Sequence, residues 1–276
     1  MKKILLLPNP KKNIPADVIE DLQAKICSWG ADAQIAPLPD TGADLTVYAG
    51  ADLLVVLGGD GTIINVSRVT ASMNIPIVGV NFGHVGYMAG IEAADTDSLL
   101  QIIRGDFEIQ RRMMLDITLI RDGQGLSPTH PALNDVVLSN GPIPRLLYFD
   151  IYCNGRFSHS LRSDGIVIAT PTGSSAYSMS AGGPVMDPTL FCICATPICC
   201  HNLSSRPVIY SGDAVLEIRN MRCRNNSIYL SVDGKEVMEI YDGDVIRIAK
   251  SAYTVPLVWP GKKNFVEVLN SKLSGN

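Results

Sequence analysis

The sequence Gly58-Gly59-Asp60-Gly61-Thr62 places a backbone that is almost free of side chains next to a carboxylate. Glycines let a backbone approach a phosphate group closely, and the amino terminus of a helix favours negative charge. A carboxylate repels phosphate, so Asp60 indicates work on a hydroxyl group or a metal ion. The alternative interpretation is a tight glycine-rich turn that carries a solvated aspartate.

A second stretch of chemical interest runs from Arg162 to Pro184 and is rich in small hydroxylated residues. A short β-rich run over 166–170 leads into serines and threonines, then into Tyr177 and a Gly-Gly-Pro sequence. Hydroxyls and exposed amides can bind a purine edge or a ribose, and a tyrosine ring can pack on an aromatic base. The alternative, equally compatible with these residues alone, is an irregular serine-rich surface loop.

The elements around the first stretch predict an α/β domain. Leu53–Leu57 is a short apolar run typical of a strand buried on both faces of a parallel sheet, and apolar residues recur at helical spacing after Thr62. Ile4–Leu7 and Ile77–Val80 are similar runs, and the second of them also ends in a glycine-containing loop. Ligands bind at the carboxyl ends of strands in such sheets, so we expect both loops at one end of the sheet.

After Arg111-Arg112 the helical spacing fades and Asp-Gly and Asn-Gly turn signals recur. Short β-rich runs lie between these turns, at 117–120, 149–153, 215–218, 228–232 and 245–248. Regularly spaced short strands of this kind are typical of an antiparallel sandwich or barrel. We therefore expect an α/β N-terminal domain with a parallel, Rossmann-like sheet in residues 1–110 and a C-terminal all-β sandwich domain in residues 111–261. Residues 262–276 are a candidate completion of the first domain.

Composition narrows the class of protein. With 46% hydrophobic and 18% charged residues the chain is globular, and its 276 residues allow two domains. A net charge of −4 argues against a general nucleic-acid binder, and no apolar run is long enough to span a bilayer. The residues before Pro8 fit a first strand better than a signal peptide. We therefore expect a cytoplasmic protein with neither a nucleic-acid nor a membrane partner.

The chain has seven cysteines, an odd number that fits reduced thiols in the cytosol. Four of them lie between Cys192 and Cys200, next to His201. The stretch is apolar, and its spacing lacks the paired C-x-x-C of structural zinc sites. We therefore favour small buried side chains over a metal site.

Taken together, these motifs make the chain resemble the NAD kinase family over nearly its whole length. The resemblance rests on Gly58–Thr62, Asn81–Tyr87, Asn134-Asp135, Arg162–Pro184, His201–Pro207 and the Asp233-Gly234 turn. The first motif is shared with diacylglycerol and sphingosine kinases, whereas Asp164–Tyr177 with the following Gly-Gly-Pro is more specific. The resemblance implies a kinase that transfers the γ-phosphoryl group of ATP to the 2′-hydroxyl of the adenosine ribose of NAD, giving NADP and ADP.

The resemblance also implies roles by position. Asp60 would be the catalytic residue that accepts the ribose proton, and the phosphate loop for ATP would be Gly58, Gly59, Gly61 and Thr62. The NAD-binding residues would be Asp60, Gly61, Asn134, Asp135, Arg145, Arg162, Asp164, Ser175, Ala176, Tyr177 and Ser180. Mg²⁺ would accompany ATP, with no metal site built from the protein alone. Family members are homo-oligomers, so the resemblance implies a homotetramer or homodimer.

Three positions depart from the family's usual residues. Asp135 stands where glutamate is common, Ser175 where threonine is common, and Cys200 where proline is common. Two other functions stay open at this point. A lipid kinase of the diacylglycerol kinase type predicts an apolar cavity for acyl chains, and a non-catalytic NAD sensor has no need of Asp60.

Overall fold

The computed structural model describes residues 2–40, 42, 44–82, 86–95, 97–128, 130–140, 146–202, 205–223, 227–259 and 264–273. The chain divides into two compact units, one of Met1–Arg112 with Tyr253–Asn276 and one of Met113–Ala252. The sequence predicts residues 262–276 as a candidate completion of the first domain. In the structure the return to this domain comes at Tyr253, because strand β17 (Val245–Trp259) continues from the second unit into the first without a turn.

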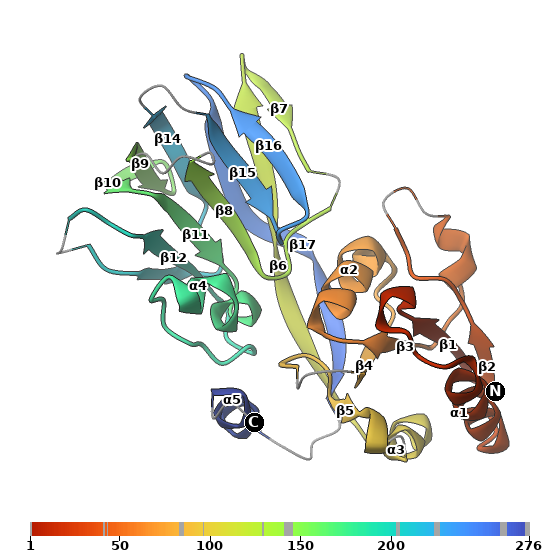
Figure 1. The fold of residues 1–276 in the computed structure, drawn as a ribbon. Coiled ribbons are helices and arrows are strands. Elements are labelled where there is room, and N and C mark those ends of the chain that lie inside the picture. The colour runs from red at the N-terminus through yellow and green to blue at the C-terminus, as the bar shows by residue number, and fades with distance from the viewer. Residues whose placement is uncertain are drawn as a thin grey trace. The chain divides into compact units, whose positions relative to one another are not determined.

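The first unit is an α/β domain whose parallel strands lie in the order β4-β3-β1-β2 (Figure 1). Its strands are β1 (Lys3–Pro8), β2 (Asp32–Ile35), β3 (Leu53–Gly58), β4 (Ile77–Asn81), β5 (Ile91–Glu92) and the end of β17, where Leu257 pairs with Ile77. Its helices are α1 (Ala16–Ser28), α2 (Asp60–Thr70), α3 (Ser98–Arg104) and α5 (Phe265–Leu273), with 3₁₀ turns η1 (Pro10–Lys12), η2 (Leu45–Tyr48), η3 (Ala71–Met73) and η4 (Ala93–Asp95).

Helices cover both faces of this sheet, which explains why its central strands β1, β3 and β4 are largely apolar. All six residues of β3 are buried. Residues of α1 and α3 share one buried cluster with residues of β1, β3 and β4. On the other face, the side chain of Ile63 in α2 lies against Gly79 of β4, where a Cβ atom would clash with it. The predicted parallel α/β domain is confirmed.

The second unit consists of two antiparallel sheets. One has the strand order β13-β12-β11-β8-β15-β16, and in the other β10-β9-β14-β17 is joined by β6 and β7. The strands are β6 (Glu108–Arg121), β7 (Gln124–Leu126), β8 (Asp135–Asn140), β9 (Leu147–Cys153), β10 (Arg156–Ser163), β11 (Gly165–Ala169), β12 (Cys192–Ile198), β13 (Val208–Ser211), β14 (Leu216–Cys223), β15 (Ile228–Val232) and β16 (Glu236–Ile240). The turn η5 (Thr172–Ser175) and the short helix α4 (Tyr177–Ser180) follow β11.

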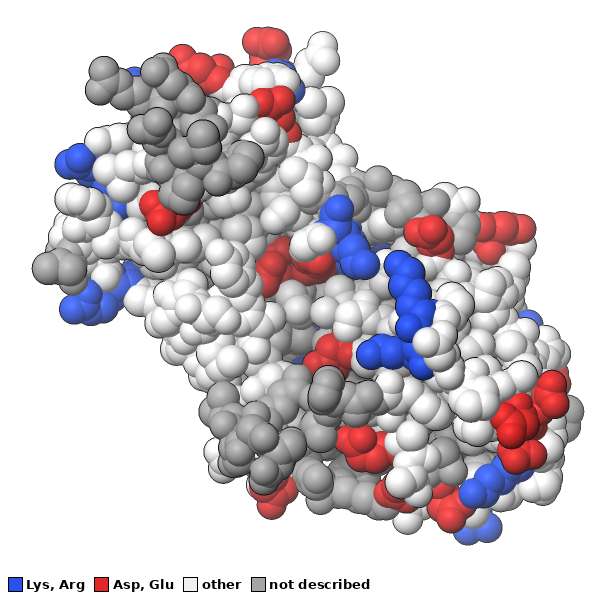
Figure 2. All heavy atoms as spheres, in the orientation of Figure 1, with Lys and Arg blue, Asp and Glu red and all other residues white. Residues whose placement is uncertain are grey.

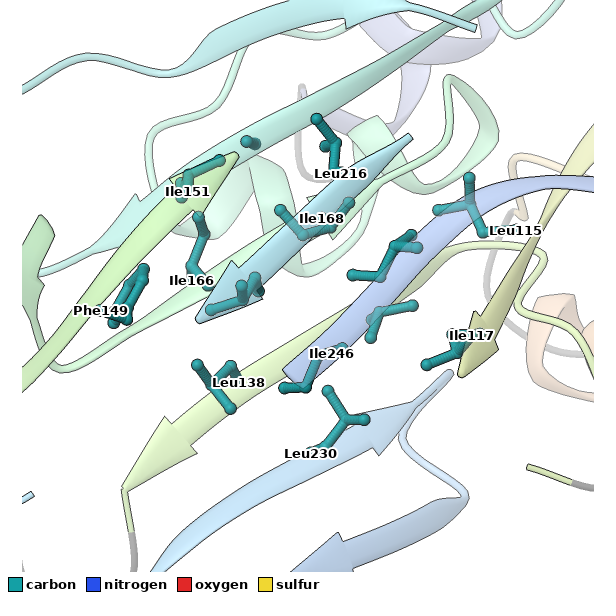
Figure 3. Packing of buried hydrophobic residues seen from close by; sticks show 14 of the residues in the cluster. Leu115, Ile117, Leu138, Phe149, Ile151, Ile166, Ile168, Leu216, Leu230 and Ile246 are labelled. Atoms are coloured by element: carbon teal, nitrogen blue, oxygen red, sulfur yellow. The ribbon is translucent and has the colours of Figure 1, made fainter. Parts of the chain in front are cut away.

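The core of the second unit lies between these sheets (Figure 3). Phe149 and Ile151 of β9 belong to the same buried cluster as Ile166 and Ile168 of β11, although β9 and β11 are in different sheets. Every second residue of these strands therefore faces the cluster, and burial of each such side chain contributes about 1.5–3 kcal/mol. Two antiparallel sheets that share one apolar core form a sandwich, so the predicted all-β sandwich is also confirmed.

Two further observations concern the charged side chains on the surface and the length of the helices. On the face drawn in Figure 2, Lys and Arg side chains are interspersed with Asp and Glu side chains. In the part of the chain that the structure describes, none of the helices is both long enough and apolar enough to cross a bilayer.

Candidate functional site

In the first unit, Asp60 lies at the point where β3 ends and α2 begins. One carboxylate oxygen accepts the backbone N–H of Tyr87 at 2.7 Å, and the other accepts the N–H of Met88 at 3.0 Å. A Cβ atom on Gly86 would collide with the same carboxylate. Burial, and secondarily the charge of Asp60, raise the pKa of the Tyr87 phenol. The Asp60 carboxylate is therefore held in one orientation by the loop after β4.

The glycines beside Asp60 have different reasons to be glycine. A Cβ atom on Gly58 would lie 2.5 Å from Oγ1 of Thr62, so the fold itself excludes a side chain there. A Cβ atom on Gly59 would meet only Oδ1 of Asn81, at 4.0 Å, and one on Gly61 would meet no described atom within 4 Å. The packing of the chain does not require the last two glycines. Open space at Gly59 and Gly61 suits the close approach of a ligand.

Polar residues from neighbouring strands meet at this end of the sheet. Asn9 follows β1, and its side-chain amide donates to Oγ1 of Thr62 at 2.7 Å. Asn81 ends β4, and its amide donates to the Glu92 carboxylate at 3.1 Å. The expected meeting of the loops after β3 and β4 is confirmed by the bonds of Asp60 to Tyr87 and Met88, while residues 83–85 lie outside the described part.

In the second unit, four of the predicted residues border one pocket of about 440 Å³. Its lining consists of Asn134, Asp135, Val137, Ser139, Ala176, Tyr177, Ser231, Asp233 and Gly234. Asn134, Asp135, Ala176 and Tyr177 are the predicted members. The pocket therefore joins segments about forty and one hundred residues apart in the sequence, which supply polar groups and one aromatic ring.

Asp233 holds the Asn134-Asp135 segment in place. Its carboxylate accepts the backbone N–H groups of Leu133, Asn134 and Asp135 at 2.8, 2.8 and 3.0 Å. In return, the backbone N–H of Asp233 donates to the carbonyl of Asp135 at 3.0 Å. Asp233 adopts a left-handed backbone conformation with φ of 48°, which aspartate tolerates better than most residues.

The segment after β11 holds Asn134 from the other side. The hydroxyl of Thr170 donates to the carbonyl of Leu133 at 2.6 Å, and the N–H of Thr170 donates to the carbonyl of Asn134 at 2.9 Å. A Cβ atom on Gly173 would collide with the backbone of Asn134. Gly173 is therefore glycine because the two chain segments approach too closely for any side chain.

Two groups in the pocket are poised for a ligand. Oδ1 of Asn134 is buried without a hydrogen-bond partner among the described residues, so an incoming donor would satisfy it. The side chain of Asp135 is also buried. Burial, together with the nearby negative charge of Asp233, raises the pKa of Asp135 to about 7. This carboxyl group can therefore exchange its proton near neutral pH.

Apart from Asp60 and Gly61 in the first unit, the other predicted NAD-binding residues lie elsewhere in the second unit or are not described. Ser180 lines a separate pocket of about 570 Å³, which Tyr177 also borders together with Cys199, Cys200 and Arg206. The hydroxyl of Ser175 donates to the carbonyl of Thr172 at 3.4 Å.

Arg162 and Asp164 flank the end of β10. The guanidinium of Arg162 donates to the hydroxyl of Tyr148 at 2.8 Å and lies over its ring. The backbone N–H of Asp164 donates to the carbonyl of Ile198 at 3.0 Å. Arg145 lies outside the described residues.

The serine-rich stretch is not a surface loop. Thr172, Ser174 and Ser178 are buried, and the hydroxyl of Ser174 accepts the N–H of Met186 at 2.9 Å. The interpretation of this stretch as an irregular exposed loop is therefore wrong. Several of its hydroxyls serve the fold, whereas Tyr177 is exposed and borders both pockets.

Besides the Asp233-Gly234 turn, which contributed to the family resemblance without an assigned role, the smaller pocket is lined by three residues to which the sequence did not point, namely Val137, Ser139 and Ser231. In β8 and β15 these positions alternate with the buried core residues Leu138 and Leu230. The period of two along each strand could have placed them on the face opposite the core.

The expectation of buried cysteine side chains holds only in part, because Cys199 is exposed and Cys200 is only partly buried. Cys194 is buried and Cys192 is partly buried, and burial raises the pKa of both thiols. Among the described residues, no three His, Cys, Asp or Glu side chains gather so that they could hold a metal ion.

Comparison with known protein families gives two matches. Residues 27–107 match the model of the ATP-NAD kinase N-terminal domain, and residues 133–259 match the model of the ATP-NAD kinase C-terminal domain. A protein named NAD kinase from Symbiobacterium thermophilum is 37% identical over 284 aligned positions, which cover 100% of both chains. A protein of the same name from Geotalea daltonii is 40% identical over 224 positions, covering 81% of this chain and 78% of that protein.

Two solved structures share the fold. The crystal structure of yeast NADH kinase complexed with NADH has a TM-score of 0.86 at 24% identity, covering 100% of this chain and 88% of the yeast chain. The crystal structure of an NAD kinase from Archaeoglobus fulgidus in complex with ATP has a TM-score of 0.78 at 21% identity, covering 99% and 98% of the two chains.

Proposed function

Because this chain belongs to the NAD kinase family, we propose that it transfers the γ-phosphoryl group of ATP to the 2′-hydroxyl of the adenosine ribose of NAD, giving NADP and ADP. The observation that carries this proposal is the Asp60 carboxylate, fixed by Tyr87 and Met88 beside two glycines that the packing leaves open. Such a site combines a proton acceptor with room for phosphate.

Phosphoryl transfer requires mainly positioning and charge stabilisation from the protein. A ribose hydroxyl is a weak nucleophile while it holds its proton, and a carboxylate can accept that proton as transfer proceeds. In our proposal Asp60 accepts the proton. The backbone of Gly58, Gly59, Gly61 and Thr62 forms the loop that admits the phosphate chain of ATP.

The pocket of about 440 Å³ supports a role in binding NAD. Its unpartnered acceptor on Asn134 suits a hydroxyl or amino group, and Asp135 suits a ribose hydroxyl. The exposed ring of Tyr177 can stack on an aromatic base. We assign Ala176 to the same pocket. We also retain Gly61, Arg145, Arg162, Asp164, Ser175 and Ser180 as proposed NAD-binding residues from the family resemblance.

We propose Mg²⁺ as the cation that accompanies ATP. Mg²⁺ prefers oxygen ligands and keeps phosphate and water in its shell. A cation that arrives bound to the triphosphate needs few ligands from the protein. Glu92, which accepts a hydrogen bond from Asn81 at the end of β4, is a carboxylate near the glycine loop that would hold it, and the bound ion would offset phosphate charge. Activity that disappears with EDTA and returns with Mg²⁺ would support this assignment.

We also propose a homo-oligomer, tetramer or dimer, and a cytoplasmic location. The six cysteines that the structure describes are free thiols, which supports a reducing compartment. Exposed apolar side chains of the second unit, such as Leu190, Phe191 and Ile209, support a subunit contact. Light scattering of the active enzyme tests the oligomer, and an active monomer would contradict it.

One assay separates the proposed function from the two other candidates. The purified protein is incubated with ATP, Mg²⁺ and NAD, and NADP is measured with an NADP-specific dehydrogenase. NAD kinase activity predicts NADP and ADP in equal amounts. Binding of NAD without NADP formation would indicate a sensor, and phosphorylation of diacylglycerol in place of NAD would indicate a lipid kinase.

A further inference from the structure

The turn that follows β1 is fixed directly to the glycine loop. Asn9 donates its backbone N–H to the carbonyl of Leu57 at 3.0 Å, and its side-chain amide donates to Oγ1 of Thr62 at 2.7 Å. The side-chain oxygen of Asn9 accepts the N–H of Lys11 at 2.9 Å. A single asparagine thus joins the end of β3, the first turn of α2 and the turn η1.

The turn η1 contributes nothing to the apolar core. None of its residues is buried, and its 3₁₀ conformation is set by Pro10 at the start and by Asn13 in a left-handed conformation at the end. Pro10 fixes φ and so limits the freedom of the turn. A rigid exposed turn, held to the end of β3 and to the glycine loop by two hydrogen bonds of Asn9, therefore presents Lys11 and Lys12 to solvent.

These two lysines differ from the other described lysines of the first unit. Lys2 donates to the carbonyl of Ile103 and Lys3 to that of Ala49. Lys25 pairs with the Asp97 carboxylate. Within the described part of the chain, the ammonium groups of Lys11 and Lys12 make neither a hydrogen bond nor an ion pair.

The glycine loop supplies few groups to balance a phosphate chain. Its one charged side chain, Asp60, is negative, and Gly59 and Gly61 offer space and backbone only. Ammonium groups bind phosphate oxygens by charge-assisted hydrogen bonds, which are stronger than neutral ones. A flexible four-carbon stem lets lysine reach a phosphate near the turn that carries it.

We propose that Lys11 and Lys12 bind the phosphate chain of ATP beside the glycine loop, and that Asn9 is the positioning residue that holds their turn there. This inference rests on the proposed function for the identity of the phosphate donor. In this arrangement the turn after β1 adds positively charged side chains beside the glycine loop. The ligand that the two lysines bind is a linear chain of phosphates.

The test removes both charges without adding new ones. The variant Lys11→Gln/Lys12→Gln is compared with the wild type and with the control Lys2→Gln/Lys25→Gln, which removes two charges elsewhere in the same unit. We expect the KM for ATP to rise roughly ten- to hundred-fold, as for loss of hydrogen bonds to charged groups. The KM for NAD and the melting temperature should stay close to those of the control.

Direct binding measurements separate this inference from the proposed function. Calorimetry with a non-hydrolysable ATP analogue and with tripolyphosphate should show the same loss of affinity for both probes in the lysine variant. A wild type that makes no NADP but binds both probes through the lysines would overturn the function and keep the inference. Unchanged KM and affinity in a variant that still makes NADP would overturn the inference alone.

The role of Asn9 is tested by a double-mutant cycle. If Asn9 acts by positioning the lysines, Asn9→Ala should raise the KM for ATP in the wild type. The same substitution should change that KM by less than about two-fold in the Lys11→Gln/Lys12→Gln background. Additive effects, or a fall in kcat with KM unchanged, would show that Asn9 acts on the glycine loop by itself.

Discussion

The backbone N–H of Tyr87 and the carboxylate of Asp60 form a hydrogen bond of 2.7 Å, although 27 residues separate them in the sequence. A second bond, from Met88, engages the other carboxylate oxygen at 3.0 Å. A carboxylate oxygen has more than one lone pair, so a bond from a backbone N–H does not by itself prevent its protonation. The loop after β4 therefore orients the carboxylate while leaving it able to accept a proton.

The variant Asp60→Asn should lower kcat by roughly 10²–10⁴-fold, because it removes the proton acceptor and keeps the size of the side chain. The affinity for NAD, measured by calorimetry, should change much less. The side-chain amide of the variant has only one acceptor oxygen, so its NH₂ group faces one of the two backbone N–H groups, and two donors cannot form a hydrogen bond. The free energy of unfolding should therefore fall by about 1–3 kcal/mol.

Asp52→Asn is the matched control for this variant. The Asp52 carboxylate accepts the backbone N–H of Lys3 at 2.8 Å in the same unit, so its loss affects a similar bond away from the glycine loop. The control should keep kcat near that of the wild type. If Asp60→Asn instead weakens NAD binding and keeps kcat, Asp60 binds the ribose hydroxyls and does not accept a proton from them.

Gly58 and Gly61 should respond in opposite ways to alanine. Gly58→Ala places a methyl group 2.5 Å from Oγ1 of Thr62 and should lower the free energy of unfolding by about 1–3 kcal/mol. Gly61 lies inside α2 with open space around its Cα atom, and alanine favours a helix over glycine by up to about 1 kcal/mol.

Gly61→Ala should therefore keep or raise the melting temperature while lowering kcat/KM for ATP, because the methyl group occupies space kept for the ligand. Chemical denaturation and steady-state kinetics on both variants check this pair. A Gly61→Ala enzyme that is as active as the wild type would show that no ligand approaches the loop at this position.

Asp233 should act on the NAD pocket through the backbone it holds. Asp233→Ala leaves three backbone N–H groups without their acceptor, so both stability and NAD affinity should fall strongly. Asp233→Asn keeps one acceptor oxygen and tolerates the left-handed backbone, so its loss should be intermediate. Asp213→Ala, which removes only an exposed ion pair with Lys250, is the control and should change neither quantity noticeably. Equal losses for Asn and Ala at position 233 would contradict the anchoring role.

Local patterns were enough to predict most of the first unit. The buried run Leu53–Leu57 and the helical spacing after it became β3 and α2, and the apolar run Ile4–Leu7 lies in β1. These signals depend on neighbours within a few residues. Gly59 and Gly61 could also be assigned to a ligand-binding loop, because a glycine-rich segment between a strand and a helix is a local feature of the sequence.

Contacts between distant segments were not predictable in the same way. The bond of Asp233 to Leu133 spans 100 residues, and nothing in the Asp-Gly turn itself indicates that partner. Strand β17 is far longer than the run 245–248 that predicted it, because exposed residues after the run, such as Lys250 and Tyr253, interrupt the apolar pattern. The segment after Asn264, part of the candidate completion of the first domain, forms α5 and groups with the first unit.

The buried carboxyl of Asp135 should make the stability of the protein depend on pH. Its pKa is raised from the ordinary value of 3.8 to about 7, by burial first and by the charge of Asp233 second. Between these two values the folded state holds a proton that the unfolded state has released. The contribution of this group to the free energy of unfolding is therefore present at acid pH and is lost as pH rises toward 7.

Asp135→Asn removes this titration and keeps the shape of the side chain. In urea unfolding without NAD, the variant should gain stability relative to the wild type between pH 5 and pH 8, by an amount on the order of a few kcal/mol at most. Using the difference between the two proteins cancels the titration of groups common to both, such as Asp244, whose pKa the Arg121 guanidinium helps to lower. A difference that stays constant across this range would show that Asp135 is ionised in the folded protein throughout.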